Sequence, residues 1–221
     1  MIHVIIPCYL LPDNNNALLK WTARCVESLR ENTSQPYRVL IIDNGSQMGT
    51  GYLMAISTSG YYRRNPSNYG FARAVNQGLK ISMDADWIVV ANNDIEFLPN
   101  WFEYMSSAWD EKTGVISSHL HAHDPEHKAG VQDATVGTMF GALWMTKPGI
   151  VVDVGLLDEG YKFGYFEDRD YWQRVLAAGY TMKKAGWCNH AGNATSGKLK
   201  NMNEFFMANK KRYEEKWQIK S

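Results

Sequence analysis

The 221-residue sequence has little cysteine, no excess of either charge and no long apolar run. Its three cysteines, Cys8, Cys25 and Cys188, are too few and too scattered for a disulfide framework or a CxxC metal site, so we expect a reducing, cytoplasmic compartment. Lys and Arg total 23, as do Asp and Glu, which gives no electrostatic reason to expect a nucleic-acid partner. No stretch approaches the roughly 20 apolar residues of a transmembrane helix. The short apolar run Met1 to Pro7 lacks a basic region and predicts a first core strand rather than a signal peptide.

The chain also lacks internal repeats, low-complexity tracts and proline-rich linkers, which favours one domain over residues 1–221. In the first half, short apolar strands alternate with amphipathic helices, a pattern typical of parallel strands joined by right-handed crossovers. The second half is mixed. We expect an α/β fold with a mixed, mostly parallel central sheet flanked by helices. A nucleotide-binding half is expected at about 1–97 and an acceptor and catalytic half at about 98–221.

The expected elements follow from apolar periodicity and from the residues that break it. Strands are expected at 1–7, 37–42, 60–63, 87–91, 115–120, 138–145 and 180–188. Helices are expected at 18–29, 71–79, 101–109 and 168–178, with a C-terminal helix from Asn203 to Lys220.

The clearest polar feature is the abrupt end of the apolar run 87–91 at Asn92, Asn93 and Asp94. The run predicts a strand buried on both faces, and open α/β sheets bind ligands at the carboxyl ends of such strands. Two amides and a carboxylate are oxygen ligands suited to a divalent cation that also holds phosphate oxygens. An ordinary turn rich in Asn and Asp explains this stretch equally well when it is taken alone.

Two further segments have a functional and a structural interpretation. Asp43 ends the strand 37–42 and would accept hydrogen bonds from a base or ribose, or else form an Asx turn. Gly70 opens a helix whose first N–H groups and Arg73 would face a phosphate. For this second segment alone, a capped amphipathic helix is the simpler interpretation.

Three acids follow an aromatic, glycine-containing loop between Tyr161 and Asp170 and lead into a predicted helix. The helix dipole favours acids at a helix start, and Asp170 has the spacing to pair with Arg174. The dipole does not explain why so apolar a loop should run directly into them. An apolar wall disfavours the ionised form of a carboxylate and suits it to general-base work, so this stretch is the strongest local candidate for a catalytic site.

Histidines occur in two places. His190 follows the last predicted strand and is a metal candidate only where the fold brings it near Asp94. Four more histidines lie between 119 and 127, together with two acids. Their spacing matches no established zinc pattern, and one loop rarely supplies a whole tetrahedral shell. We expect this segment to be a polar loop on the acceptor side.

Taken in order, these motifs resemble the family 2 glycosyltransferases from Val4 to about Ser196. The segments that carry the resemblance are IIPCY at 5–9, IIDNGS at 41–46, NYGFARAVNQG at 68–78, ANND at 91–94, GALWMTKPGIVVDVGLLDE at 141–159, FEDRDYWQRVLAAGY at 166–180 and His190. The resemblance implies a Rossmann-like GT-A fold. It also implies inverting transfer of a hexose from a nucleotide diphosphate sugar to an acceptor hydroxyl.

The resemblance further implies residue roles. Nucleotide contacts would come from Pro7 and Tyr9 at the base, Asp43 at the base or ribose, Asn68, Gly70 and Arg73 at the ribose and diphosphate, and Asn92 and Asn93 at the strand end. Mn²⁺ or Mg²⁺ would be bound by Asp94 and His190. Asp168 would be the catalytic base beside Glu167, and the sugar and acceptor side would hold Trp144, Phe163 and Asp170. Because residue 92 is an amide, Asp94 is the only acid of the metal-binding element, and we expect weaker metal affinity.

UDP-glucose is the first donor implied by the resemblance, and the acceptor is expected to be a glycan or another hydroxyl compound. Two other functions stay open. A catalytically weak or inactive nucleotide-sugar-binding module would fit the weakened metal element. A sugar nucleotidyltransferase usually has a glycine-rich, basic loop after the first strand, and residues 8–16 contain neither glycine nor a basic residue. Peripheral membrane attachment through C-terminal aromatic residues is a further alternative, which core packing explains equally well.

Overall fold

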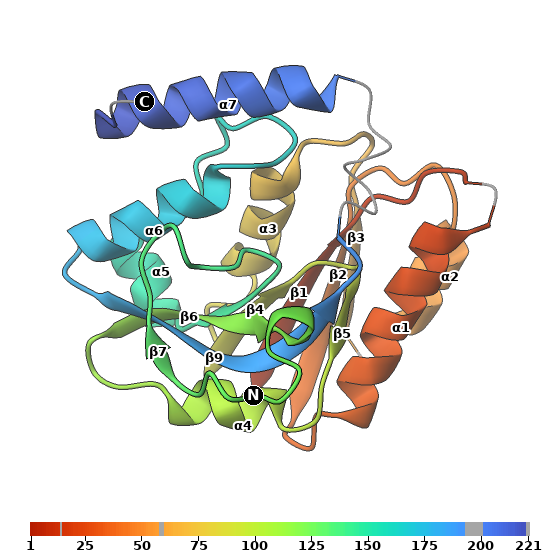
Figure 1. Ribbon diagram of the computed structural model, residues 1–221. Helices are drawn as coiled ribbons and strands as arrows, with labels where there is room; N and C mark the ends of the chain where they lie inside the picture. The colour runs from red at the N-terminus through yellow and green to blue at the C-terminus, as the bar shows by residue number, and fades with distance from the viewer. Residues whose placement is uncertain (14, 58–59, 193–200, 220–221) are drawn as a thin grey trace.

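The computed structural model describes residues 1–13, 15–57, 60–192 and 201–219. A central sheet lies between helices on its two faces, and the last helix lies apart from the sheet, beyond α6 (Figure 1). The strands are β1 (Ile2–Cys8), β2 (Tyr37–Asp43), β3 (Tyr61–Arg64), β4 (Trp87–Ala91), β5 (Ile95–Phe97), β6 (Thr113–Leu120), β7 (Gln132–Asp133), β8 (Leu143–Thr146) and β9 (Thr181–His190). The helices are α1 (Ala17–Glu31), α2 (Thr50–Ile56), α3 (Phe71–Lys80), α4 (Trp101–Ser107), α5 (Pro148–Val154), α6 (Glu167–Ala177) and α7 (Met202–Trp217), with a 3-10 turn η1 (His121–His123).

The sheet has the strand order β3-β2-β1-β4-β8-β6-β9-β5, and β7 pairs with β9. Strands β1 to β4, β6 and β9 run in one direction, and β5, β7 and β8 run against them. The expected mixed, mostly parallel α/β sheet is therefore confirmed. The order reverses at β1, which is flanked by β2 and β4, and open α/β sheets bind ligands beyond the strand ends at such a point.

Both faces of the sheet are buried. Successive side chains of a strand point to opposite faces, so neighbouring residues of one strand join different apolar clusters. Val4 and Ile6 of β1 join an apolar cluster that includes residues of α1 and α4, whereas Ile5 joins a second cluster with α3 and α6. All three side chains are 0% exposed. Burial on both faces explains why the strands are continuous apolar runs in the sequence.

Four short helices and strands were not expected from the sequence, and one of them is the two-residue strand β7. The helices α2 and α5 each span seven residues and bury only two side chains, too few to produce a helical pattern, and β5 has three residues. The strand expected at 138–145 begins only at Leu143. Residues before it form turns instead, since the Phe140 N–H binds the Ser117 hydroxyl and the Met139 N–H binds the Thr135 carbonyl.

The two expected halves share one sheet, because β4 of the first pairs with β8 of the second. The division near residue 97 stays a prediction. Ser196, the expected end of the family-like stretch, and Lys220, the expected end of the C-terminal helix, lie outside the described residues. Among the residues that are described, no helix combines the length and apolar character needed to cross a membrane.

Gly78 of α3 provides a test of the close packing between this helix and β1. A Cβ at this position would collide with the Ile5 side chain, so Gly78→Ala should lower the free energy of unfolding by about 1–3 kcal/mol. Gly51 of α2 has open space around it, and Gly51→Ala should stabilise the protein by up to about 1 kcal/mol. Urea denaturation measures both values. Equal effects of the two substitutions would contradict the packing described.

Candidate active site

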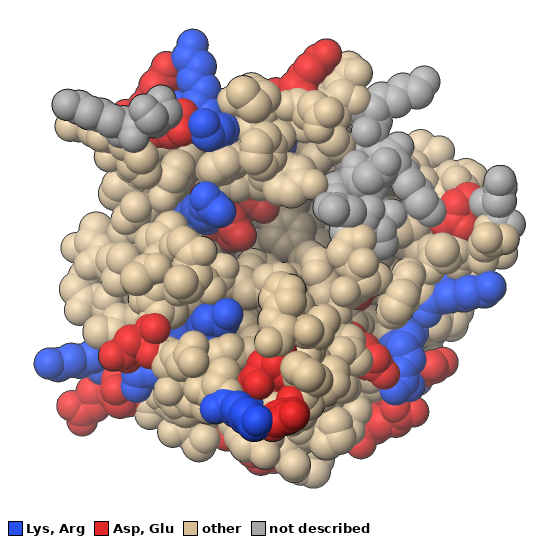
Figure 2. Space-filling view, viewed as in Figure 1, with Lys and Arg blue, Asp and Glu red and all other residues tan. Residues whose placement is uncertain are grey.

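A cleft of about 810 Å³ opens where β1 and β4 end. Its remaining walls come from three segments, namely the turn before β8, the loop before α6, and α7. Figure 2 shows the hollow in the middle of one face, with acidic and basic side chains beside it. The ends of the parallel strands therefore form one side of a concave site, and segments from the second half of the chain form the other.

Asp94 and His190 lie together in this cleft. Asp94 belongs to the turn between β4 and β5, and β5 pairs with the end of β9, where Ile95 is opposite His190. His190 Nε2 lies 3.2 Å from Asp94 Oδ1, and both side chains line the cleft. The fold thus satisfies the condition on which His190 became a metal candidate.

Asn92 adds a third potential ligand to this pair. Its Oδ1 is buried and has no hydrogen-bond partner among the described residues, although the side chain lines the cleft. Asn93 differs, because its Nδ2 donates to Thr22 Oγ1 at 2.8 Å and holds the turn against α1. A carboxylate, an imidazole and an amide oxygen fit a divalent cation such as Mn²⁺. The described residues contain no group of three or more His, Cys, Asp or Glu that could hold a metal, so the remaining ligands would be water or substrate oxygens.

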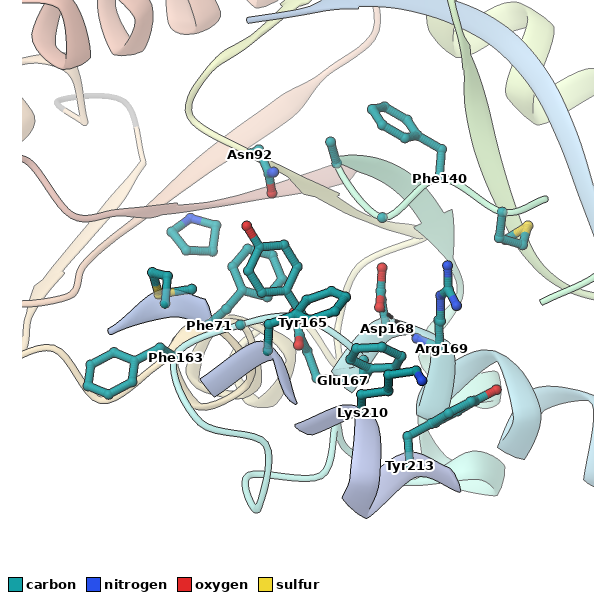
Figure 3. Close-up of a pocket in the computed structure, with 18 of the residues that line it drawn as sticks. Phe71, Asn92, Phe140, Phe163, Tyr165, Glu167, Asp168, Arg169, Lys210 and Tyr213 are labelled. Atoms are coloured by element: carbon teal, nitrogen blue, oxygen red, sulfur yellow. Dashed lines mark hydrogen bonds between the residues drawn. The ribbon is translucent and has the colours of Figure 1, made fainter. Parts of the chain in front are cut away.

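Glu167 and Asp168 begin α6 on the opposite side of the cleft. Asp168 Oδ1 accepts a hydrogen bond from the Arg169 N–H at 2.7 Å, and its carboxylate points toward the side where Asn92 and Phe140 lie (Figure 3). The other carboxylate oxygen packs against Gly141, where any Cβ would collide with it. A glycine at this position is therefore required by the placement of Asp168.

The electrostatic environment of the two acids is unusual. Burial raises the pKa of Asp168, against a smaller opposing effect of Arg169. Burial and then the charge of Asp168 raise the pKa of Glu167, whose Oε2 is buried without a hydrogen-bond partner among the described residues. A raised pKa makes an ionised carboxylate a better proton acceptor.

The loop that leads into these acids has an unusual backbone. Phe163, Tyr165 and Phe166 all have positive φ, at 60°, 74° and 71°, a conformation that costs free energy in residues other than glycine. The Asn209 side chain of α7 holds this loop. Its Oδ1 accepts from the Lys162 N–H at 3.0 Å, and its Nδ2 is 2.9, 2.8 and 3.3 Å from the carbonyl oxygens of residues 162, 164 and 165. Asn209 is 2% exposed.

The predicted nucleotide side of the cleft is formed by strand and helix ends. Pro7, Tyr9 and Asn68 all line it, as expected. Asn44, which was not singled out from the sequence, lines it as well and donates to Asn68 Oδ1 at 2.8 Å. Its neighbour in the sequence is Asp43, and side chains of neighbouring residues in a strand point in opposite directions.

Three residues expected at the nucleotide do not line the cleft. Asp43 is fully buried, and its carboxylate accepts hydrogen bonds from the Ser46 N–H, Tyr62 Oη and Arg64 Nη1. Its oxygens therefore have protein partners in this structure, and the contact with a base or ribose stays a prediction. Arg73 instead lies over the Tyr69 ring, 4.3 Å from its centroid, and Gly70 packs its backbone against Phe163.

Two residues expected on the sugar and acceptor side are structural. Trp144 is 1% exposed and packs edge-on against Trp172, with ring centroids 5.2 Å apart, so its indole is not available to stack on a sugar. Asp170 is 0% exposed and pairs with Arg174 at 3.0 Å and Lys216 at 2.7 Å. Phe163, by contrast, lines the cleft as expected.

Helix α7 supplies cleft residues that sequence reasoning missed. Phe206, Lys210, Tyr213 and Glu214 line the cleft, and Lys210 pairs with Glu214 at 3.0 Å. Their spacing of three or four residues was a usable signal for a buried face. The sequence contained no indication of what that face would contact.

The histidine-rich segment packs around an indole. The rings of His119 and His127 stack on Trp187, with centroids 5.5 and 4.4 Å away, and His121 Nδ1 lies 2.9 Å from His127 Nε2. Trp187 Nε1 donates to Asp124 Oδ2 at 2.8 Å. These ring contacts and hydrogen bonds explain why the histidines of this segment gather around Trp187.

Comparison with known proteins identifies the class. Residues 3–152 match the family described as glycosyl transferase family 2, and the chain belongs to this family. This is the family that the resemblance of its motifs implied. No curated protein sequence matches the chain.

Solved structures share the GT-A fold. GalNAc-T7, crystallised with UDP, GalNAc and Mn²⁺, is 13% identical with a TM-score of 0.69, and the match covers 86% of this chain and 43% of that protein. The mannosyltransferase PcManGT of Pyrobaculum calidifontis, in complex with GDP-Man and Mn²⁺, is 18% identical with a TM-score of 0.67, covering 88% of this chain and 57% of that one. TarS 1-349 of S. aureus is 13% identical with a TM-score of 0.64, covering 84% and 59%. The chain thus spans about half the length of these proteins.

The raised pKa of Glu167 predicts a pH-dependent cost in stability. The folded state favours the protonated carboxyl, so its contribution is present at acid pH and is lost as the pH rises from the ordinary carboxyl pKa through the raised value. Glu167→Gln should therefore gain stability relative to the wild type between pH 5 and pH 8.5, by at least about 1.4 kcal/mol, the value of one pKa unit. Denaturant unfolding at the two pH values measures this difference.

Glu215→Gln is the matched control, since the Glu215 side chain is 68% exposed on α7. It should show no such pH-dependent change. A constant difference between Glu167→Gln and the wild type across this pH range would contradict the inferred environment of Glu167.

Proposed function

We propose that this glycosyltransferase moves a hexose from a nucleotide diphosphate sugar to an acceptor hydroxyl with inversion, and that Asp168 is the general base. One observation carries the proposal. The Asp168 carboxylate and the Asp94–His190 pair line the same cleft, on different elements, at the switch point of the sheet. A proton acceptor and a site for anionic phosphate oxygens in one cleft are the two requirements of this reaction.

The chemistry is a single displacement. The acceptor oxygen forms a bond to the anomeric carbon while the bond from that carbon to the diphosphate oxygen breaks, and its electron pair leaves with the diphosphate. Asp168 takes the proton of the acceptor hydroxyl as that oxygen attacks. The raised pKa of Asp168 favours this transfer. Attack from the face opposite the leaving group inverts the anomeric configuration and needs no covalent nucleophile.

The other side of the cleft holds the leaving group. A divalent cation bound by Asp94, His190 and the Asn92 amide oxygen would neutralise diphosphate charge as a Lewis acid. Asn68 lines the cleft beside Pro7 and Tyr9, where the nucleoside would lie, and Asn44 holds it there through the hydrogen bond to its Oδ1. UDP-glucose is the first donor to test, since a structural neighbour binds UDP, and GDP-mannose is the second, since another neighbour binds that sugar nucleotide.

The thiols support a proposal for where the protein is located. Cys8, Cys25 and Cys188 are all free and buried, and burial raises their pKa values. Unpaired thiols support a reducing compartment, and we infer that the protein is cytoplasmic.

Hydrolysis of UDP-glucose and GDP-mannose, with and without Mn²⁺, tests the proposal together with transfer to a panel of hydroxyl acceptors. Asp168→Asn should lower kcat for transfer by at least about 100-fold, because a general base contributes about 10² to 10⁴. Asp84→Asn is the control, since its side chain is 78% exposed at the start of β4, away from the strand ends that form the cleft. Full activity of Asp168→Asn would refute the assignment of the base. Calorimetric binding of donor without any turnover would instead establish an inactive binding module.

A further inference from the structure

A second, smaller pocket lies beside the cleft. It measures about 320 Å³, and we call it the side pocket; it is lined by His119, Asp124, Met139, Phe140 and Lys184, among others. Met139 and Phe140 also line the main cleft, so only this short turn separates the two spaces.

The turn that contains Met139 and Phe140 contacts both functional parts of the cleft, the Asp94–His190 pair and Asp168. The Phe140 ring lies edge-on to the His190 ring, with centroids 5.4 Å apart, and the next residue, Gly141, packs against the Asp168 carboxylate. The Ser117 hydroxyl fixes the turn through the Phe140 N–H at 3.2 Å. A compound whose hydroxyl approaches Asp168 would therefore extend past Phe140 toward the side pocket.

Lys184 of β9 is the unusual residue of the side pocket. Its side chain is half-buried, and it forms no ion pair in the part of the chain that the structure describes, whereas its neighbour Lys183 pairs with Asp110 at 2.6 Å. Burial lowers the pKa of Lys184, and no carboxylate opposes this effect. Because the Lys184 side chain lines the side pocket and has no counter-ion among the described residues, its charge is available to an anionic occupant.

The one acid of the side pocket does not neutralise Lys184. Asp124 accepts hydrogen bonds from the Lys128 N–H, the Ala129 N–H and Trp187 Nε1, all between 2.8 and 2.9 Å. These donors occupy its carboxylate and lower its pKa. The side pocket therefore holds an ionised Asp124 whose oxygens already accept three hydrogen bonds, and among the described residues Lys184 is its one group that can donate a charged hydrogen bond without first giving up an ion pair.

We propose that the side pocket binds an anionic group of the acceptor, a carboxylate or a phosphate, through Lys184. The acceptor class is then an acidic sugar or a phosphate-bearing hydroxyl compound rather than a neutral sugar. The occupant is identified as the acceptor because of the proposed transfer to a hydroxyl at Asp168, and this part of the assignment rests on the proposed function. The binding itself does not depend on catalysis.

Binding is tested by NMR titration with methyl glucuronide and glycerol 3-phosphate against their neutral counterparts, methyl glucoside and glycerol. The wild type should bind one of the anionic probes, and Lys184→Met should weaken that binding by about tenfold or more, the effect of losing one charged hydrogen bond. Lys184→Arg should retain most of it, and Lys183→Met is the control on the same strand. The two anionic probes distinguish a carboxylate from a phosphate ligand.

Equal binding of charged and neutral probes, no binding of any probe, or equal binding by wild type and Lys184→Met would each overturn the proposal. In transfer assays the same variant should raise KM for the anionic acceptor and leave donor hydrolysis unchanged. If Lys184→Met keeps donor hydrolysis and its KM for the anionic acceptor equals that of the wild type, only the side-pocket proposal is refuted. Absence of donor turnover in the wild type refutes the proposed function instead.

A separate observation concerns Asn209. Four hydrogen bonds join this one buried side chain to a loop with three residues of positive φ, and that loop ends at Glu167 and Asp168. We infer that Asn209 is a positioning residue that holds the loop, and with it the start of α6, in the conformation that presents Asp168. It touches no reacting atom.

Asn209→Ser removes the amide nitrogen that contacts three carbonyl oxygens of the loop and adds no charge. Asn209→Asp places a carboxylate against the same three carbonyl oxygens. Both should lower kcat by about 100-fold, the cost of a misplacement of about 1 Å, while KM for the donor stays unchanged. They should also move the acid limb of the pH–rate profile, because the burial of Asp168 changes with the loop. Asn203→Asp, on an exposed position of α7, is the matched control.

Rates are expressed per folded molecule, measured by circular dichroism, so that loss of folded protein is separated from loss of catalysis. A wild type that turns over donor while Asn209→Ser keeps both its kcat and its pH profile would overturn the positioning role. A wild type without turnover would count against the proposed function itself.

Discussion

Asp170 is a fully buried carboxylate on α6, and it ties the C-terminal end of helix α7 to the rest of the molecule. Lys216 Nζ at 2.7 Å and Trp217 Nε1 at 3.0 Å reach it from α7, and Arg174 Nε at 3.0 Å reaches it from its own helix. Removing a charge from water costs several kcal/mol, which these partners offset only when they are all in place. This arrangement at one end of α7 and the Asn209 contacts nearer its middle together hold the helix beside the cleft.

The first turn of α6 contains three acids in three different environments. Asp170 has cationic partners, Asp168 has one N–H donor and the adjacent Arg169 charge, and Glu167 has an oxygen without a partner in the described structure. Such a separation of environments lets neighbouring carboxyl groups take different roles at one pH. The structural acid fixes the wall of the cleft, and the two others face into it.

Local patterns were sufficient to predict the long apolar strands, the strand-end position of Asp94 and the loop that leads into Asp168, but not the short strands β5 and β7 or the start of β8. They failed where the outcome depended on distant partners. Nothing near Asp170 in the sequence indicates Trp217, which lies 47 residues further along and occupies one of its oxygens. For the same reason the enclosure of Asp43 could not be predicted from the sequence, because Arg64 and Tyr62 reach it from another strand. The pairing of Asp94 with His190 likewise depends on β9.

The place of Asp168 depends in part on the absence of a Cβ at Gly141. Glycine at position 141 leaves room for the carboxylate, the residue before it faces a histidine of the metal pair, and Met139, two residues before it, lines both the cleft and the side pocket. A side chain of another size at position 139 would reshape the space between the two pockets without entering the room that the Asp168 carboxylate needs. Acceptor choice and base placement are thus set by different residues of one short turn.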